Sequence, residues 1–198
     1  MRNYIIVGLS FFFILFASGF FFVVDQTKQV IVFQFGETRA VHQSPGLKFK
    51  LPFIQNVVYY DSRVLNLDPA QEEVILRDQK RIVVDSIVRY MINDPLKFFQ
   101  TTRTELALND RLGRIVNSSV RGVIAQYQLN DLLSDDRDKI MAEIFENVRE
   151  DQDTFGIEIV DLRLKRTELT PEVQSNVFDR MRTEREREAN LLRAEGQE

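Results

Sequence analysis

Residues 3–24, NYIIVGLSFFFILFASGFFFVV, decide the organisation of this chain, because they carry no charged side chain between Arg2 and Asp25. A helix rises about 1.5 Å per residue, so a stretch of this length reaches about 30 Å, the thickness of a bilayer's hydrocarbon core. Each Phe, Ile, Leu or Val favours insertion by about 0.3–0.6 kcal/mol. The stretch predicts a single transmembrane helix over residues 1–24, a signal-anchor that keeps everything after it at a membrane.

Two other interpretations of this stretch fit less well. A cleaved signal peptide would use the small residues 17–19, but the apolar run exceeds the usual h-region of about 7–15 residues. A buried core helix would need a polar face, and the stretch has none. Arg2 favours an inside amino terminus, which puts the bulk of the chain on the outer side of the membrane, although Lys28 and Arg39 reduce the difference in positive charge between the two ends of the stretch. The side chains expected in the membrane include Tyr4, Ile5, Phe13, Phe16, Phe22 and Val24.

The composition argues against most enzyme classes. With no cysteine and a single histidine, His42, the chain cannot form disulfides or a thiolate metal site. The best nucleophile pairs are His42 with Ser44 and Ser86 with Lys80, and neither has a recognisable surrounding motif. A net charge of −4 argues against a nucleic-acid partner. We therefore expect no catalytic site, no metal and no cofactor.

Residues 25–93 have the pattern of a β-rich module. Residues 29–35 are rich in Val, Ile and Phe and stop at a glycine, as strands do. A Pro-Gly turn then opens residues 47–51, LKFKL, which alternate between an apolar face and a lysine face. Residues 77–80 look like a hairpin loop before a strand over 81–92. In that strand one face would carry Ile82, Val84, Val88, Tyr90 and Ile92.

The spacing of apolar residues changes from strand-like alternation to a helical repeat in residues 94–168, which predict an α/β module. Asp94-Pro95 is a helix start, with Asp as the cap and Pro in the first helical position. A helical apolar stripe follows at Leu108, Leu112, Ile115, Val116, Val120, Val123, Ile124 and Tyr127. A second helix would bury Ile140, Met141, Ile144, Phe145 and Val148. Phe155-Gly156 ends it, and residues 157–164 read as a strand whose alternation shifts phase between Ile159 and Val160.

Residues 169–198 predict a charged helix that begins a coiled coil. Residues 182–188, RTERERE, contain no apolar side chain, so such a helix is marginal alone and favours a neighbouring helix. A plain solvated helix is the alternative. The expected partner contacts are Arg182, Glu184, Arg185, Glu188, Leu191 and Leu192. The charged run continues almost to the last residue, which suggests a truncated chain; Gly196 as a helix cap is the opposite interpretation.

Several motifs together resemble the stomatin/prohibitin/flotillin/HflK-HflC (SPFH, band 7) family, and within it the HflK/HflC branch. They follow one another in family order over nearly the whole chain, and each alone is weak. They are VFQFGE at 32–37, PGLKFKLPFI at 45–54, VDSIVRYMINDP at 84–95, GIEIVDLRLK at 156–165 and DRMRTERER at 179–187.

The resemblance implies an α+β fold and a non-enzymatic membrane scaffold. Relatives of this branch form a ring or cage with an HflK-like protein on the outer face of the bacterial inner membrane, and that hetero-oligomer regulates an FtsH-like AAA+ protease. The alternative is a stomatin-like module that organises lipid in the cytoplasm without a protease partner. A strand edge near the bilayer would let Phe49, Phe53 and Ile54 touch lipid, unless they fill the core of the β module.

Overall fold

The computed structural model describes residues 19–134, 136–169, 182–183, 185–187 and 189. By its internal contacts the chain divides into two compact units, each drawn from several segments. The first comprises residues 1–67, 89–110 and 149–161, and the second comprises residues 68–88, 111–148 and 162–198. Helices and strands are mixed in both, so the predicted α+β class is confirmed.

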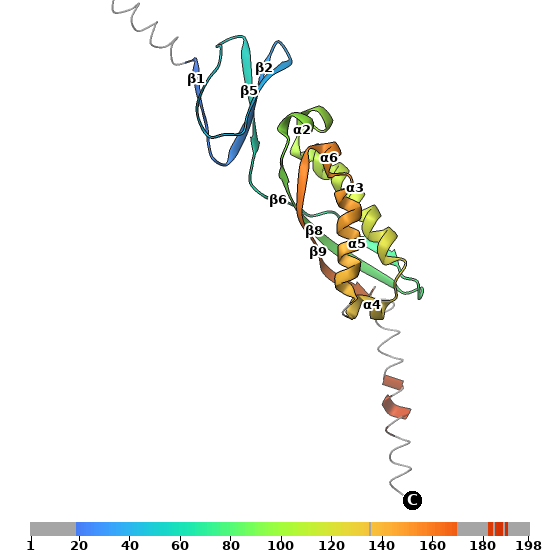
Figure 1. Cartoon of the computed structure of the whole chain (residues 1–198). Helices are drawn as coiled ribbons and strands as arrows, with labels where there is room; N and C mark the ends of the chain where they lie inside the picture. Colours follow the sequence, from blue (N-terminus) through green and yellow to red (C-terminus); the bar gives the residue numbers. More distant parts are fainter. Residues whose placement is uncertain (1–18, 135, 170–181, 184, 188, 190–198) are drawn as a thin grey trace, which may run out of the picture. The chain divides into compact units, whose positions relative to one another are not determined.

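Five strands form the amino-terminal β module (Figure 1). Strands β2, β3 and β5 make an antiparallel sheet in the order β3-β2-β5, and β1 pairs with β4 in a separate antiparallel ribbon. The core of the module contains Phe22, Val24, Val30 and Val32, with Ala40 and Val57 packed against it. The strands are β1 (Phe21–Val24), β2 (Lys28–Gln34), β3 (Glu37–His42), β4 (Gly46–Phe49) and β5 (Gln55–Asp61).

Strand β1 corrects the predicted end of the membrane helix. Phe22 and Val24 are 7% and 1% exposed and belong to the β core, and the β1 backbone pairs with β4. A residue that both fills this core and pairs with a strand cannot end a helix, so the helix predicted to run through Val24 is wrong over Phe21–Val24. Residues 1–18 lie outside the described part of the chain. Among the described residues, every helix is too short or too polar to cross a bilayer.

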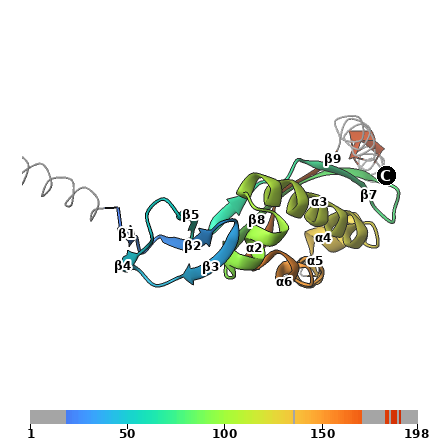
Figure 2. The same ribbon diagram turned by 90° about the horizontal axis from the view of Figure 1, so that it is seen from above.

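A second sheet is built around the long strand β8. It pairs with β6, β7 and β9, and Gly156 at the start of β9 accepts backbone hydrogen bonds from Asn93 and Asp94 just beyond β8. The side chains predicted to share one face of β8 are all buried, and Figures 1 and 2 show α3 and α5 together on one side of this sheet. The strands are β6 (Leu65–Leu67), β7 (Glu72–Ile75), β8 (Arg81–Ile92) and β9 (Ile157–Leu169).

Specific capping residues set the start of α2 and the end of α6. Asp94 caps α2 as predicted, with its carboxylate accepting from the Leu96 and Lys97 backbone N–H groups. Gly156 ends α6 in the left-handed conformation, with φ of 67°. The short helices α4 and α6 were not predicted. The helices are α2 (Pro95–Thr101), α3 (Glu105–Ile124), α4 (Leu129–Leu133), α5 (Arg137–Arg149) and α6 (Gln152–Phe155).

The predicted helical stripes largely face the core. Met141 and Phe145 in α5, together with Ile115 and Tyr127, are only half-buried. The buried members are Leu108, Leu112, Val116, Val120, Val123, Ile124, Ile140, Ile144 and Val148.

Candidate functional site

The β1–β4 ribbon has one buried face and one exposed apolar face. Phe21 pairs with Phe49, and Val23 pairs with Leu47, so these four side chains lie on the same face of the ribbon. They are 54%, 57%, 65% and 65% exposed respectively, while the intervening Phe22 and Val24 fill the core. Large apolar residues thus occupy both faces of a two-stranded ribbon, and one of those faces meets solvent.

Two further phenylalanines project from turns at one end of the module. Phe35 lies in the β2–β3 turn and Phe53 in the β4–β5 loop, and they are 83% and 94% exposed. Both adopt positive φ angles, 52° and 66°. A bulky residue in the left-handed region costs about 1–2 kcal/mol, so these turns hold aromatic side chains outward in strained conformations.

Strand register brings these features to the same end of the module. Gln34, just before Phe35, pairs with Gln55, just after the 50–54 loop, and the two side-chain amides are 3.1 Å apart. The Lys50 N–H donates to the carbonyl of Phe20 at 2.8 Å. The chain therefore enters β1 at the end that carries Phe35 and Phe53.

Contacts between aromatic rings also lie at this end of the module. The Phe20 and Phe49 rings stack with centroids 5.4 Å apart, and Phe21 meets Phe49 edge-on at 6.1 Å. Leu51 and Ile54 add further exposed apolar surface. We call Phe21, Val23, Phe35, Leu47, Phe49, Leu51, Phe53 and Ile54 the apolar end of the β module.

Charged side chains are few at the apolar end and gather at the opposite one. Glu37 and Lys50 are the charged neighbours of the two projecting turns. At the other end Lys28 pairs in register with Asp61, and Asp61 forms an ion pair with Arg63 at 2.6 Å. The hydrogen bond from Arg63 is the main cause that holds the pKa of Asp61 below its usual value. Exposed apolar side chains thus lie at one end of the strands, and charged side chains lie at the other end.

The predicted lipid-contact residues are placed together by the structure. Phe49, Phe53 and Ile54 are all exposed at the apolar end, so they do not fill the core. Sequence reasoning missed Phe21, Val23 and Phe35. The alternation of residues 47–51 revealed an apolar face, but the pairing partner of that face was hidden within the presumed membrane helix.

The other predicted site residues divide into three groups. Phe22 and Val24, assigned to the membrane, lie in the β core. Arg182 and Arg185 are exposed in the described helical turns. The remainder lie outside the described residues: Tyr4, Ile5, Phe13, Phe16, Glu184, Glu188, Leu191 and Leu192.

The nucleophile pairs considered from sequence have other contacts. Lys80 forms an ion pair with Asp78 at 2.8 Å, and Ser86 is buried in the sheet. The Ser44 hydroxyl accepts from Lys48 at 3.1 Å, and the His42 ring lies against Phe22. In the described ranges no group of His, Asp and Glu side chains has the arrangement of a metal site.

Comparison with known proteins identifies a family with this organisation. Residues 22–198 match the sequence profile of the SPFH domain / Band 7 family. A protein named HflC from Buchnera aphidicola of Schizaphis graminum is 28% identical over 224 aligned residues, covering the whole chain and 71% of the relative. HflC of Haemophilus influenzae is 31% identical and covers 82% of the chain and 57% of the relative. The Escherichia coli K12 protein named modulator of FtsH protease HflC is 25% identical, covering 89% of the chain and 67% of the relative.

Proposed function

Because this chain belongs to the SPFH domain / Band 7 family, we propose that it is a non-enzymatic membrane scaffold of HflC type that modulates an FtsH-like AAA+ protease. The observation that carries the proposal is the family match over residues 22–198 together with relatives named HflC, one of them called a modulator of FtsH protease. In this proposal the chain assembles with itself and with an HflK-like protein into a ring or cage.

A co-purification and turnover experiment tests the protease role. The full chain is tagged and expressed with and without the HflK-like and FtsH-like proteins of its own genome. We expect the protease to co-purify, and the half-life of a membrane substrate of the protease to change when the chain is deleted. An unchanged half-life together with no co-purification would overturn the proposal.

The apolar stretch up to Phe20 is proposed to supply the membrane attachment, with β1 beginning at the membrane surface. The bulk of the chain would then lie in the periplasm of a bacterial inner membrane. Reporter enzymes fused after Glu198 test this topology. Activity of a periplasm-active reporter alone is expected, and activity of a cytoplasm-active reporter alone would favour the stomatin-like module that organises lipid without a protease partner.

The apolar end of the β module is proposed to rest in the same membrane surface. It lies where the chain enters from residue 20, and its exposed Phe and Leu side chains would each gain up to about 1.5–3 kcal/mol on complete transfer from water. Glu37 and Lys50 limit the depth, because their charges need the headgroup region. Phe49, Phe53 and Ile54 are the central contacts.

The absence of tryptophan from the sequence allows a direct test of this contact. A Phe53→Trp variant carries a single indole at the apolar end, and Leu106→Trp places one at an exposed site of α3 as the matched control. In vesicles containing brominated lipid, the indole at position 53 is expected to be quenched and blue-shifted, and the indole at 106 is not. Equal quenching at both positions would contradict the contact.

The charged helix is proposed to pack against a partner helix through Arg182, Glu184, Arg185, Glu188, Leu191 and Leu192. Its described turns have little apolar surface of their own, and the Arg182–Glu186 ion pair at 3.4 Å is exposed. Mixing with an HflK-like protein should raise helicity and sedimentation rate. If neither changes, the segment is a solvated helix.

A further inference from the structure

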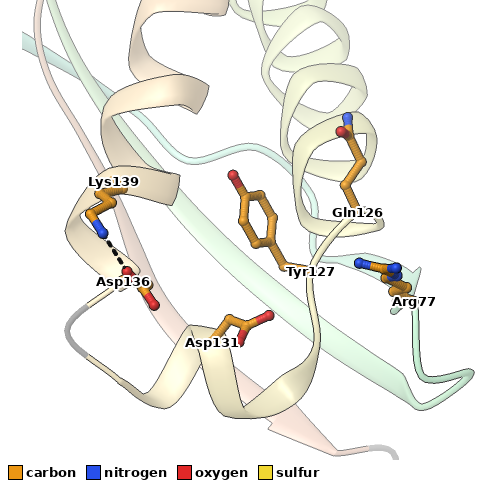
Figure 3. Close-up of a pocket in the computed structure, with 6 residues that line it drawn as sticks. All are labelled: Arg77, Gln126, Tyr127, Asp131, Asp136 and Lys139. Atoms are coloured by element: carbon orange, nitrogen blue, oxygen red, sulfur yellow. Dashed lines mark hydrogen bonds and ion pairs between the residues drawn. The ribbon is translucent and has the colours of Figure 1, made fainter.

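A hollow of about 380 Å³ lies within the second compact unit. Figure 3 shows that its walls come from the β7–β8 turn, the end of α3, α4 and the start of α5. The backbone N–H of Arg77 donates to the Tyr127 carbonyl at 3.0 Å, which fixes two of these walls together. The lining residues are Arg77, Gln126, Tyr127, Asp131, Asp136 and Lys139.

One wall of the hollow is an aromatic ring surrounded by carboxylates. The Tyr127 hydroxyl donates to the Glu143 carboxylate at 2.8 Å, and this hydrogen bond is the main cause that raises the pKa of Tyr127. Asp131 and Asp136 add to the same electrostatic effect. An aromatic ring flanked by carboxylates is the environment that binds a guanidinium group.

The carboxylates retain hydrogen-bonding capacity. Asp131 accepts from the Gln128 N–H through Oδ2, and Asp136 accepts from Lys139 through Oδ1 at 2.6 Å. The other oxygen of each carboxylate accepts no hydrogen bond from the described residues. A carboxylate can accept from a planar guanidinium through such an oxygen.

The other wall has the opposite charge. Arg77 is exposed, and Figure 3 shows it on the opposite side of Tyr127 from the Lys139–Asp136 ion pair. The hollow therefore presents carboxylates and an arginine to the same occupant. A segment that alternates basic and acidic side chains would match both walls.

The chain itself contains such a segment. Arg182, Arg185 and Arg187 are exposed in the described turns of the charged helix, and Glu186 lies four residues after Arg182. Because these arginines are exposed within one copy, they do not fill the hollow of their own chain. A second copy can supply them.

We propose that this hollow receives the Arg/Glu segment, residues 182–187, of a second copy of the chain, with an arginine against Tyr127 and the Asp131 and Asp136 carboxylates and a glutamate against Arg77. The inference rests on the self-association in the proposed function. It assigns Arg182 and Arg185 to a second copy of the chain, which leaves Glu188, Leu191 and Leu192 for the partner helix.

Disulfide trapping tests this contact cleanly, since the sequence contains no cysteine. One tagged full-length copy carries Gln126→Cys and a differently tagged copy carries Thr183→Cys, and both are co-expressed in membranes and mildly oxidised. Disulfide formation requires Cα atoms within about 7 Å. The control pair replaces Gln126→Cys with Ser118→Cys, an exposed position in α3 eight residues before Gln126.

We expect the disulfide between copies to form at least about fivefold more from position 126 than from position 118. Reversing the charges with Arg182→Glu and Arg185→Glu should lower that yield about fivefold at low salt, the upper range for exposed charge pairs. Equal yields from both positions, or no effect of charge reversal, would overturn the inference. If sedimentation still shows an oligomer in that case, the proposed scaffold stands; loss of the oligomer in the unaltered chain would count against both.

Discussion

The β1–β4 ribbon and the β8 sheet are built from the same alternating pattern and end in opposite environments. In β8 the apolar positions Ile82 and Val84 are buried, and Figure 1 shows α3 and α5 beside this sheet. In β4 the apolar positions Leu47 and Phe49 point outward, while Lys48 between them is half-buried. Alternation therefore shows that a strand has two faces, and a second element decides which face is covered.

That second element is a helix in one region, and none of the elements in the described part of the chain covers the other. The β8 sheet is followed by α3, whose apolar stripe contributes Leu108, Leu112 and Val116 to the buried core. The β4 strand is followed by a short loop and then by β5, which pairs with β2. Apolar area left in water forgoes about 25 cal/mol per Å², so the outward face of the ribbon would gain free energy from any apolar surface that covered it.

The largest expected effect separates a covered leucine from an uncovered one. Leu112→Ala removes a fully buried side chain of α3 and should lower the free energy of unfolding by about 2–5 kcal/mol. Leu47→Ala removes a side chain that is 65% exposed and should cost less than about 1 kcal/mol. Urea unfolding of the full chain in mild detergent, followed by circular dichroism, measures both. A comparable loss for Leu47→Ala would mean that the ribbon face is packed after all.

The covered region was the more predictable of the two. The helix stripe, the hairpin turn before Arg81, the Asp94 cap and the break at Gly156 follow from local periodicity and backbone chemistry, which the sequence displays directly. The phase shift after Ile159 is also present, since Ile159 and Leu162 are both buried across it.

The uncovered region was predicted only in part. Phe21–Val24 continue an apolar run, and hydropathy does not mark the boundary at which strand β1 begins. Pairing with β4 decides that boundary, and such long-range pairing leaves no local signal. Phe35 was likewise missed, because the apolar run predicts it as the last residue of a strand over 29–35, whereas β2 ends at Gln34 and Phe35 lies in the turn.

A second prediction compares two glycines with positive φ, Gly156 directly before β9 and Gly36 in the turn between β2 and β3. An alanine Cβ at Gly156 would lie 2.5 Å from the Asp94 carbonyl oxygen and 2.9 Å from the Phe98 nitrogen, so Gly156→Ala should cost about 2–4 kcal/mol from backbone strain and overpacking. Gly36→Ala has the same unfavourable φ but no atom within 4 Å, so it should cost about 1 kcal/mol. The shift in the urea midpoint measures the difference, and equal losses would show that strain alone decides both.

The smallest effect concerns two tyrosines at alkaline pH, one in the β8 sheet and one in the β3-β2-β5 sheet. Tyr90 of β8 donates to Asn109 at 3.0 Å, and burial raises its pKa to about 12, with a further contribution from Glu105. Tyr60 of β5 donates to the Arg103 carbonyl, and burial raises its pKa as well.

Since the folded state holds the Tyr90 proton more tightly than the unfolded chain, the stability due to Tyr90 is complete below about pH 10 and declines between pH 10 and 12. Tyr90→Phe should cost about 1 kcal/mol at neutral pH through its lost hydrogen bond, and it should flatten that alkaline decline. Tyr60→Phe is the matched control and should flatten it less, because only Tyr90 has its pKa raised as far as 12. Unfolding midpoints between pH 8 and 12 measure the slopes; a Tyr90→Phe slope equal to that of the unaltered chain would show that the phenol is not held neutral by the fold.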